Sequence, residues 1–109
     1  MRYYYEDKWV KIIHGDCREI LPCLDCKVDL VLTSPPYGDM YFGYDIDGWV
    51  KLMSDTIPKA ETALSGGGKL VINVNNYITS RKAGWDKRQV IPLTMYIQQI
   101  CKLNYQDEI

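Results

Sequence analysis

The residues best suited to chemistry are Ser34, Pro35, Pro36 and Tyr37, which follow the apolar run 28–31. Two consecutive prolines fix two backbone φ angles and remove two amide donors, and Pro36 also favours an extended conformation at Pro35. The segment is therefore stiff. It presents the Ser34 hydroxyl and the Pro35 carbonyl as acceptors beside the flat ring of Tyr37. These groups suit an exocyclic aromatic amine, which brings two N–H donors and a π face for stacking.

The position of this segment supports a role in ligand binding. The apolar run 28–31 predicts a buried parallel strand, so the polar residues from Ser34 onward lie at the carboxyl end of that strand. Open α/β sheets bind their ligands at this end. The alternative is a Pro-Pro turn that joins a strand to a loop, with Tyr37 capping the core.

Thr33-Ser34-Pro35-Pro36-Tyr37 resembles motif IV of the DNA methyltransferases that modify cytosine N4 or adenine N6. The order of motifs is that of the beta group, in which motif IV precedes the glycine-rich cofactor motif. The resemblance implies that a base is flipped out of double-stranded DNA and that its amine attacks the methyl group of S-adenosyl-L-methionine. Serine at the head of the motif favours cytosine N4, because the adenine N6 enzymes more often carry aspartate there. Related RNA and protein-glutamine methyltransferases usually carry asparagine and are less favoured.

The mechanism that the resemblance implies agrees with the residue types. An aryl amine is a weak nucleophile because its lone pair is delocalised into the ring. Acceptors at Ser34 and Pro35 would draw its nitrogen towards tetrahedral geometry and direct the lone pair at the sulfonium methyl. Pro36 would keep the segment rigid, and Tyr37 would stack on the flipped base. No covalent intermediate and no cysteine nucleophile are required.

Gly15 and Asp16 match motif III of the same family, which lies along the adenosine of the cofactor. The resemblance therefore implies that Gly15, Asp16 and Ser34 contact S-adenosyl-L-methionine. The residues themselves also support a local role, because Asp16-x-x-Glu19 resembles a capping box that opens a short helix through Leu21. The two roles of Asp16 are compatible.

Composition limits the remaining options. The chain has 109 residues, 13 basic and 14 acidic, with a net charge of -1. One domain at most is expected, with no global basic field to attract DNA. No apolar run is long enough to cross a membrane, and the first residues are too polar for a signal peptide, so we expect a cytoplasmic protein. The basic cluster best placed for DNA phosphates follows the predicted strand 69–75, with a solvated loop as the alternative, and consists of Arg81, Lys82, Lys87 and Arg88.

Cysteine spacing raises the question of a metal. Cys23-x-x-Cys26 has the spacing of zinc ligands, but the chain has no second pair. The single histidine, His14, falls in a predicted strand. We therefore expect reduced structural cysteines and no metal site.

Hydrophobic periodicity predicts the elements that position the motif. Strands are expected over 9–14, 28–34 and 69–75, and helices over 16–21, 49–64 and from Pro92 onward. Pro58 should kink or divide the second helix. The glycines 66–68 should end it. The aromatic loop 38–48 is either a lid over the base or a satellite of the core.

These elements predict an α/β fold over residues 1–109, a partial Rossmann-like sheet of an S-adenosyl-L-methionine-dependent methyltransferase. The Phe-x-Gly-x-Gly motif that the resemblance requires for the cofactor is missing. By the same resemblance, the strands 9–14 and 28–34 would be separated in the sheet by two strands that the missing half carries, so uncovered sheet edges and apolar faces are expected. We therefore expect a truncated or split enzyme that binds a separate second half or another copy of itself. The alternative is a non-catalytic remnant or interaction module that has lost cofactor binding.

Overall fold

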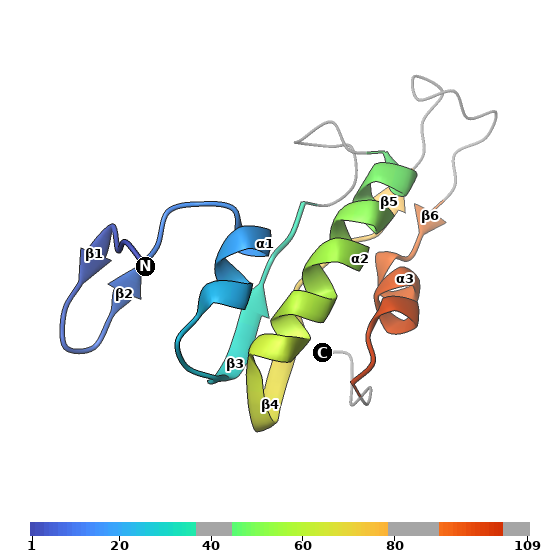
Figure 1. Cartoon of the computed structure of the whole chain (residues 1–109). Coiled ribbons are helices and arrows are strands. Elements are labelled where there is room, and N and C mark those ends of the chain that lie inside the picture. Colours follow the sequence, from blue (N-terminus) through green and yellow to red (C-terminus); the bar gives the residue numbers. More distant parts are fainter. Residues whose placement is uncertain (37–44, 79–89, 104–109) are drawn as a thin grey trace.

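A computed structural model describes residues 1–36, 45–78 and 90–103, which form a small mixed α/β fold (Figure 1). The elements in chain order are β1 (Tyr5–Glu6), β2 (Lys11–Ile12), α1 (Cys17–Ile20), the 3-10 turn η1 (Leu21–Cys23), β3 (Val28–Thr33), α2 (Ile46–Ala63), β4 (Leu64–Ile72), β5 (Tyr77–Ile78), β6 (Val90–Ile91) and α3 (Leu93–Ile100). The described strands pair as β1–β2, β3–β4 and β5–β6.

The central unit consists of β3, α2 and β4. The two strands pair in parallel, with Leu32 opposite Val71 and Thr33 opposite Ile72. Beyond the strands, the Asn73 amide donates to the Thr33 carbonyl at 2.9 Å. The predicted parallel strand before the motif is therefore confirmed, and its partner is the strand that follows α2.

The glycines 66–68 lie inside β4 and do not form the turn that was predicted after the helix. The helix ends at Ala63 and the strand begins at Leu64. The register shifts in this region, because Val28 pairs with Leu64 while Leu30 pairs with Lys69. Gly67 accommodates the irregularity with a φ of 81°, a conformation that favours glycine.

Helix α2 supplies most of the buried core, and the residue spacing explains why. Its buried residues recur every three or four positions and are Trp49, Met53, Ile57, Ala60 and Ala63. Asp45 caps its first turn by accepting from the Gly48 amide at 2.7 Å. Pro58 was expected to kink or divide this helix; it lies inside a single helix that continues to Ala63, so it does not divide it.

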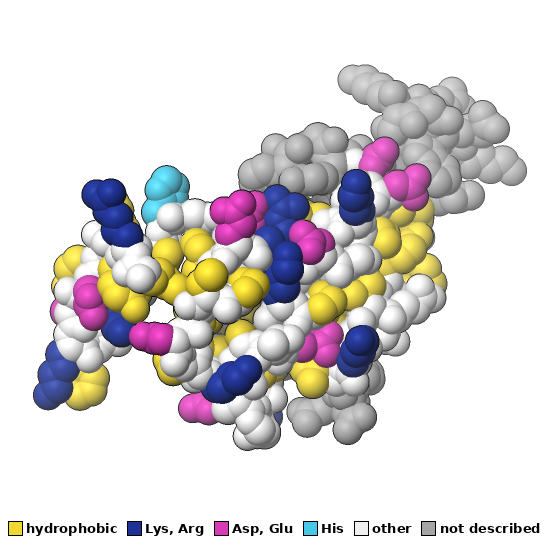
Figure 2. All heavy atoms as spheres, in the orientation of Figure 1, with side chains coloured by type: hydrophobic (Ala, Val, Ile, Leu, Met, Phe, Trp, Pro, Cys, Tyr) yellow, Lys and Arg dark blue, Asp and Glu magenta, His cyan; other side chains and the backbone are white. Residues whose placement is uncertain are grey.

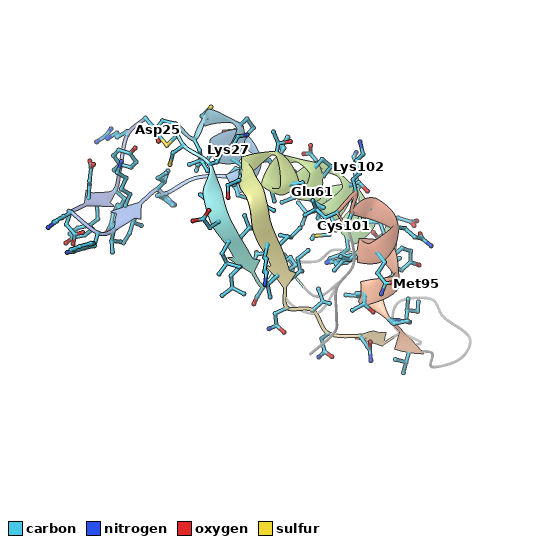
Figure 3. All side chains as sticks on the ribbon, turned by 90° about the horizontal axis from the view of Figure 1, so that it is seen from below. Asp25, Lys27, Glu61, Met95, Cys101 and Lys102 are labelled. Carbon is cyan, nitrogen blue, oxygen red and sulfur yellow. The ribbon has the colours of Figure 1, made fainter. Side chains whose placement is uncertain are left out.

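Helix α3 packs against the same buried cluster of α2 residues that β4 contacts. Leu93 is fully buried, and Tyr96, Ile97 and Ile100 pack against the same cluster, as the predicted apolar face requires. The end of α3 is fixed by Glu61 of α2, whose two carboxylate oxygens accept from the Lys102 amide at 3.2 and 3.3 Å. Figure 3 shows Glu61 and Lys102 together at this junction.

One face of the β3–β4 pair is uncovered within the described ranges. Leu70 and Ile72 pack towards α2, while Leu30, Leu32 and Val71 on the opposite face are 54%, 69% and 39% exposed. Side chains alternate between the faces of a strand, and α2 covers only one of them. The prediction that β3 is a buried strand is therefore wrong for this face of the strand. A single parallel pair also does not establish the larger Rossmann-like sheet.

The N-terminal strand differs from its prediction. Residues 9–14 were expected to form one strand of the main sheet, but only Lys11–Ile12 is a strand, and it pairs antiparallel with Tyr5–Glu6. Asp7 explains this local pairing, because its carboxylate accepts from the amides of Trp9 and Val10, both at 2.7 Å. A turn stabilised within four residues brings β1 next to β2 at little cost in chain entropy. The hairpin lies at the far end of the molecule from α3 (Figure 1).

No helix among the described residues is sufficiently long and apolar to cross a membrane.

Candidate active site

The segment Ser34–Pro36 lies directly beyond the carboxyl end of β3, where the sequence placed it. Its neighbour across the sheet is Asn73, the first residue after β4. The Asn73 side-chain amide donates to the Ser34 hydroxyl oxygen at 3.4 Å, and both side chains are exposed. Two predicted strand ends therefore bring a hydroxyl and a carboxamide together. Tyr37, the fourth residue of the motif, lies outside the described residues.

Ser34 and Asn73 face the uncovered side of the sheet. Each follows by two positions a residue of that face, Leu32 on β3 and Val71 on β4, and these two are paired. Alternation of side chains places residues two apart on the same face. Ser34 and Asn73 therefore form one continuous surface with the exposed apolar side chains Leu32 and Val71.

The far end of the segment is anchored in the core. The indole N–H of Trp49 donates to the Pro36 carbonyl. Trp49 is fully buried, lies in the first turn of α2 and meets Tyr96 edge to face with ring centroids 6.5 Å apart. A buried indole N–H usually finds a partner, and here the partner belongs to the motif.

This anchor narrows the set of acceptors that a ligand can use. The Pro36 carbonyl is already bonded to Trp49, which leaves the Ser34 hydroxyl and the Pro35 carbonyl. Pro36 also favours an extended backbone at Pro35. We therefore expect the Pro35 carbonyl to point away from the Pro36 carbonyl, which Trp49 binds. The Ser34 hydroxyl and the Pro35 carbonyl are the two acceptors that the sequence analysis predicted for an amine.

Asp16 has the structural role that the sequence predicted. It is the N-cap of α1 and accepts from the Arg18 amide at 2.9 Å. Its carboxylate also pairs with the Arg18 guanidinium at 2.6 Å, and Arg18 lies 3.9 Å from Asp55 of α2. A Cβ at Gly15 would lie 2.8 Å from the Cδ1 atom at the end of the Ile20 side chain. No hydrogen bond in the described part of the chain joins Asp16 to the Ser34–Pro36 segment.

Acid should weaken α1 through this cap. Hydrogen bonds from the Arg18 side chain and amide lower the pKa of Asp16 from 3.8 to about 2. A folded-state pKa below the unfolded one stabilises the fold above pH 3.8, and this contribution disappears as the pH falls through about 2. We expect the melting temperature of the wild type to fall over that range more than that of Asp16→Asn, which retains a capping oxygen without the charge. Circular dichroism melts of both proteins measure the difference, and parallel curves would exclude this role.

Other predicted site residues remain untested by the structure. The basic cluster, Arg81, Lys82, Lys87 and Arg88, lies outside the described residues, as does most of the aromatic loop 38–48. Over the visible face of α1 and α2, acidic and basic side chains are intermixed (Figure 2). DNA contact through the basic cluster stays a prediction.

Cys17, Cys23 and Cys26 are exposed thiols, and Cys101 is half-buried. Burial, and to a smaller degree the charge of Glu61, raise the pKa of the Cys101 thiol. The described residues contain no group of three or more His, Cys, Asp or Glu that could hold a metal ion.

A cavity of about 480 Å³ lies elsewhere, between the segment 21–27 and the second half of α2. Lys27 lines it and donates to the Thr62 carbonyl at 2.5 Å, at the C-terminal end of α2. Because Lys27 directly precedes β3 and Ser34 follows it, the cavity and the motif lie at opposite ends of that strand. The cavity therefore does not contribute to the proposed amine site.

Sequence reasoning missed two residues of the site, Trp49 and Asn73. Trp49 was predicted only as part of the apolar face of a helix, and Asn73 only as part of a strand. The available signal for Asn73 was its position, a polar side chain near the carboxyl end of a strand that runs parallel to β3. No local signal pairs the indole with Pro36, because the two residues are 13 positions apart in the sequence.

Fold and site together define a small mixed α/β protein with a rigid polar segment at the carboxyl end of a parallel strand pair. Comparison with known protein families, with curated proteins and with solved structures finds no match for this chain.

Proposed function

We propose that this chain carries the amine-binding part of an S-adenosyl-L-methionine-dependent DNA methyltransferase, which modifies the exocyclic amine of a flipped base. Cytosine N4 is favoured over adenine N6 because serine heads the motif. The observation that best supports the proposal is the anchored segment itself. Ser34 is exposed beside Asn73 at one end, and Pro36 is bonded to buried Trp49 at the other.

The roles follow from the groups available. The Ser34 hydroxyl and the Pro35 carbonyl accept the two hydrogens of the amine and hold its lone pair towards the methyl donor. When bound, S-adenosyl-L-methionine would supply an electrophilic methyl group attached to a neutral thioether leaving group. The amine forms one N–C bond and afterwards loses one proton to water. A rigid segment matters because its acceptors need no reorganisation during transfer.

The remaining contacts are proposed from the resemblance. Gly15, Asp16 and Ser34 would contact the cofactor, and in the structure the Asp16 carboxylate is already oriented by Arg18. Tyr37 would stack on the base. The basic cluster 81–88 would contact DNA phosphates.

We propose that a partner protein covers the exposed apolar face of the sheet. Leu30, Leu32 and Val71 form an uncovered apolar face, and such a face on a two-stranded sheet favours association. The partner is either a separate second half or another copy of the chain. The same face also supports the alternative function, a non-catalytic interaction module.

Calorimetric titration of S-adenosyl-L-methionine into the purified chain tests the proposal. Because the glycine-rich cofactor motif is missing, we expect binding with a dissociation constant of order micromolar, and transfer of labelled methyl groups to cytosine N4 in double-stranded DNA, only when the chain is completed by another copy or by a second half. Ser34→Ala should lower turnover more than DNA affinity, because the hydroxyl acts on the amine in the transition state. If the wild type alone does not bind the cofactor, the chain is either a half-enzyme that requires its partner or a remnant. If it neither binds the cofactor nor transfers methyl groups even with a second half supplied, the interaction module is the better description.

A further inference from the structure

The bond between Asn73 and Ser34 has consequences for what the site can recognise. The Asn73 side chain is placed by the sheet, because its backbone amide donates to the Thr33 carbonyl at 2.9 Å. Its carboxamide then donates to the Ser34 oxygen at 3.4 Å. The hydroxyl is thus oriented by a neighbouring strand end and does not depend on a loop.

A serine hydroxyl has one proton and two lone pairs. Asn73 occupies one lone pair, so Ser34 keeps one lone pair and its own proton for a ligand. Among the described residues, the Ser34 hydroxyl accepts from Asn73 and donates no hydrogen bond of its own. Ser34 can therefore accept one hydrogen bond and donate another at the same time.

We propose, on the basis of the proposed function, that Asn73 is a positioning residue that makes the site specific for an amidine edge. Such an edge carries an amine on the carbon next to an unprotonated ring nitrogen, as in cytosine and adenine. The Ser34 oxygen accepts the amine hydrogen nearer the ring nitrogen and donates its proton to that nitrogen. The Pro35 carbonyl accepts the other amine hydrogen. An aryl amine without the adjacent nitrogen loses one of these three bonds.

Two isomeric probes measure the contribution of the hydrogen bond between Ser34 and the ring nitrogen. In 2-aminopyridine the amine is next to the ring nitrogen, and in 3-aminopyridine it is one carbon further away. We would titrate each into the full chain, followed by NMR, at a pH where both ring nitrogens are unprotonated. The expected result is about tenfold tighter binding of 2-aminopyridine, the effect of one hydrogen bond. The Asn73 side-chain amide signals should shift on binding.

The matched variant is Asn73→Asp, which keeps the shape but offers acceptors only. Ser34 would then donate its proton to the new carboxylate, and the preference for 2-aminopyridine should fall below about twofold. Asn73→Ser, with a shorter donor, should restore part of it. Circular dichroism spectra check that both variants fold.

Equal affinity of the wild type for the two probes would overturn the inference. So would failure of both probes to bind, or a preference that survives in Asn73→Asp. The proposed function can fail separately. If cofactor titration and methyl transfer are negative while the preference for 2-aminopyridine holds, the site binds an amidine edge but the chain is not part of a methyltransferase. Methyl transfer with equal probe affinities would refute the role of Asn73 alone.

Discussion

Replacing Trp49 with alanine is expected to lower the free energy of unfolding by about 3–5 kcal/mol, the usual cost of removing a buried aromatic side chain. Trp49 is fully buried at the centre of the cluster with Met53, Ile57 and Leu93. Typical domains have a total stability of about 5–15 kcal/mol, so the variant should be close to unfolded. Urea unfolding monitored by circular dichroism measures the change.

Trp49→Phe separates packing from the hydrogen bond. Phenylalanine keeps much of the apolar contact but leaves the Pro36 carbonyl without its donor. A partly buried acceptor without a partner costs about 1–3 kcal/mol, so an intermediate stability is expected. NMR signals of Ser34 and Asn73 should also shift, because the motif loses its anchor. If Trp49→Phe has wild-type stability and unchanged signals at Ser34, the indole does not anchor the segment.

Replacing Leu30 and Leu32 together by serine is expected to weaken the proposed self-association by at least about a hundredfold. These side chains are 54% and 69% exposed on the uncovered face of β3. Burying a leucine contributes about 1.5–3 kcal/mol, and every 1.4 kcal/mol changes the association constant tenfold. Sedimentation velocity over a range of concentrations, from about one to one hundred micromolar, measures this shift.

The control for this experiment is Met95→Ser. Met95 lies on α3, is 44% exposed and is seen in Figure 3 on a different element from the uncovered face. Its replacement should leave association unchanged. A wild-type chain that sediments as a folded monomer throughout would contradict self-association and leave a different partner for the face.

Local patterns predicted the elements that the structure confirms. Helix α2 was predicted because Trp49, Met53, Ile57 and Ala60 repeat at helical spacing, and this signal does not depend on distant residues. The start of α1 followed from Asp16, whose capping bond spans two residues. The polar segment after β3 was also placed correctly, because a strand end is a local feature.

Competition between local and distant pairings explains the errors. Part of the segment 9–14, Lys11–Ile12, pairs with the nearby strand Tyr5–Glu6, to which the turn at Asp7 connects it, and not with the main sheet. Glycines 66–68 suit a helix end and a strand irregularity equally well, and only the register with β3 decides between them. The bond from Trp49 to Pro36 depends on how α2 packs, which periodicity does not encode.

The shared face of the sheet has a thermodynamic consequence. Leu32 and Val71 continue directly into Ser34 and Asn73, so any layer that packs on the first pair borders the second. If a ligand bound at Ser34 and Asn73 contacts a protein packed on Leu32 and Val71, each would change the binding affinity of the other by the same factor. Ligand would act as an assembly signal, and catalysis would be confined to conditions in which the chain has found its partner.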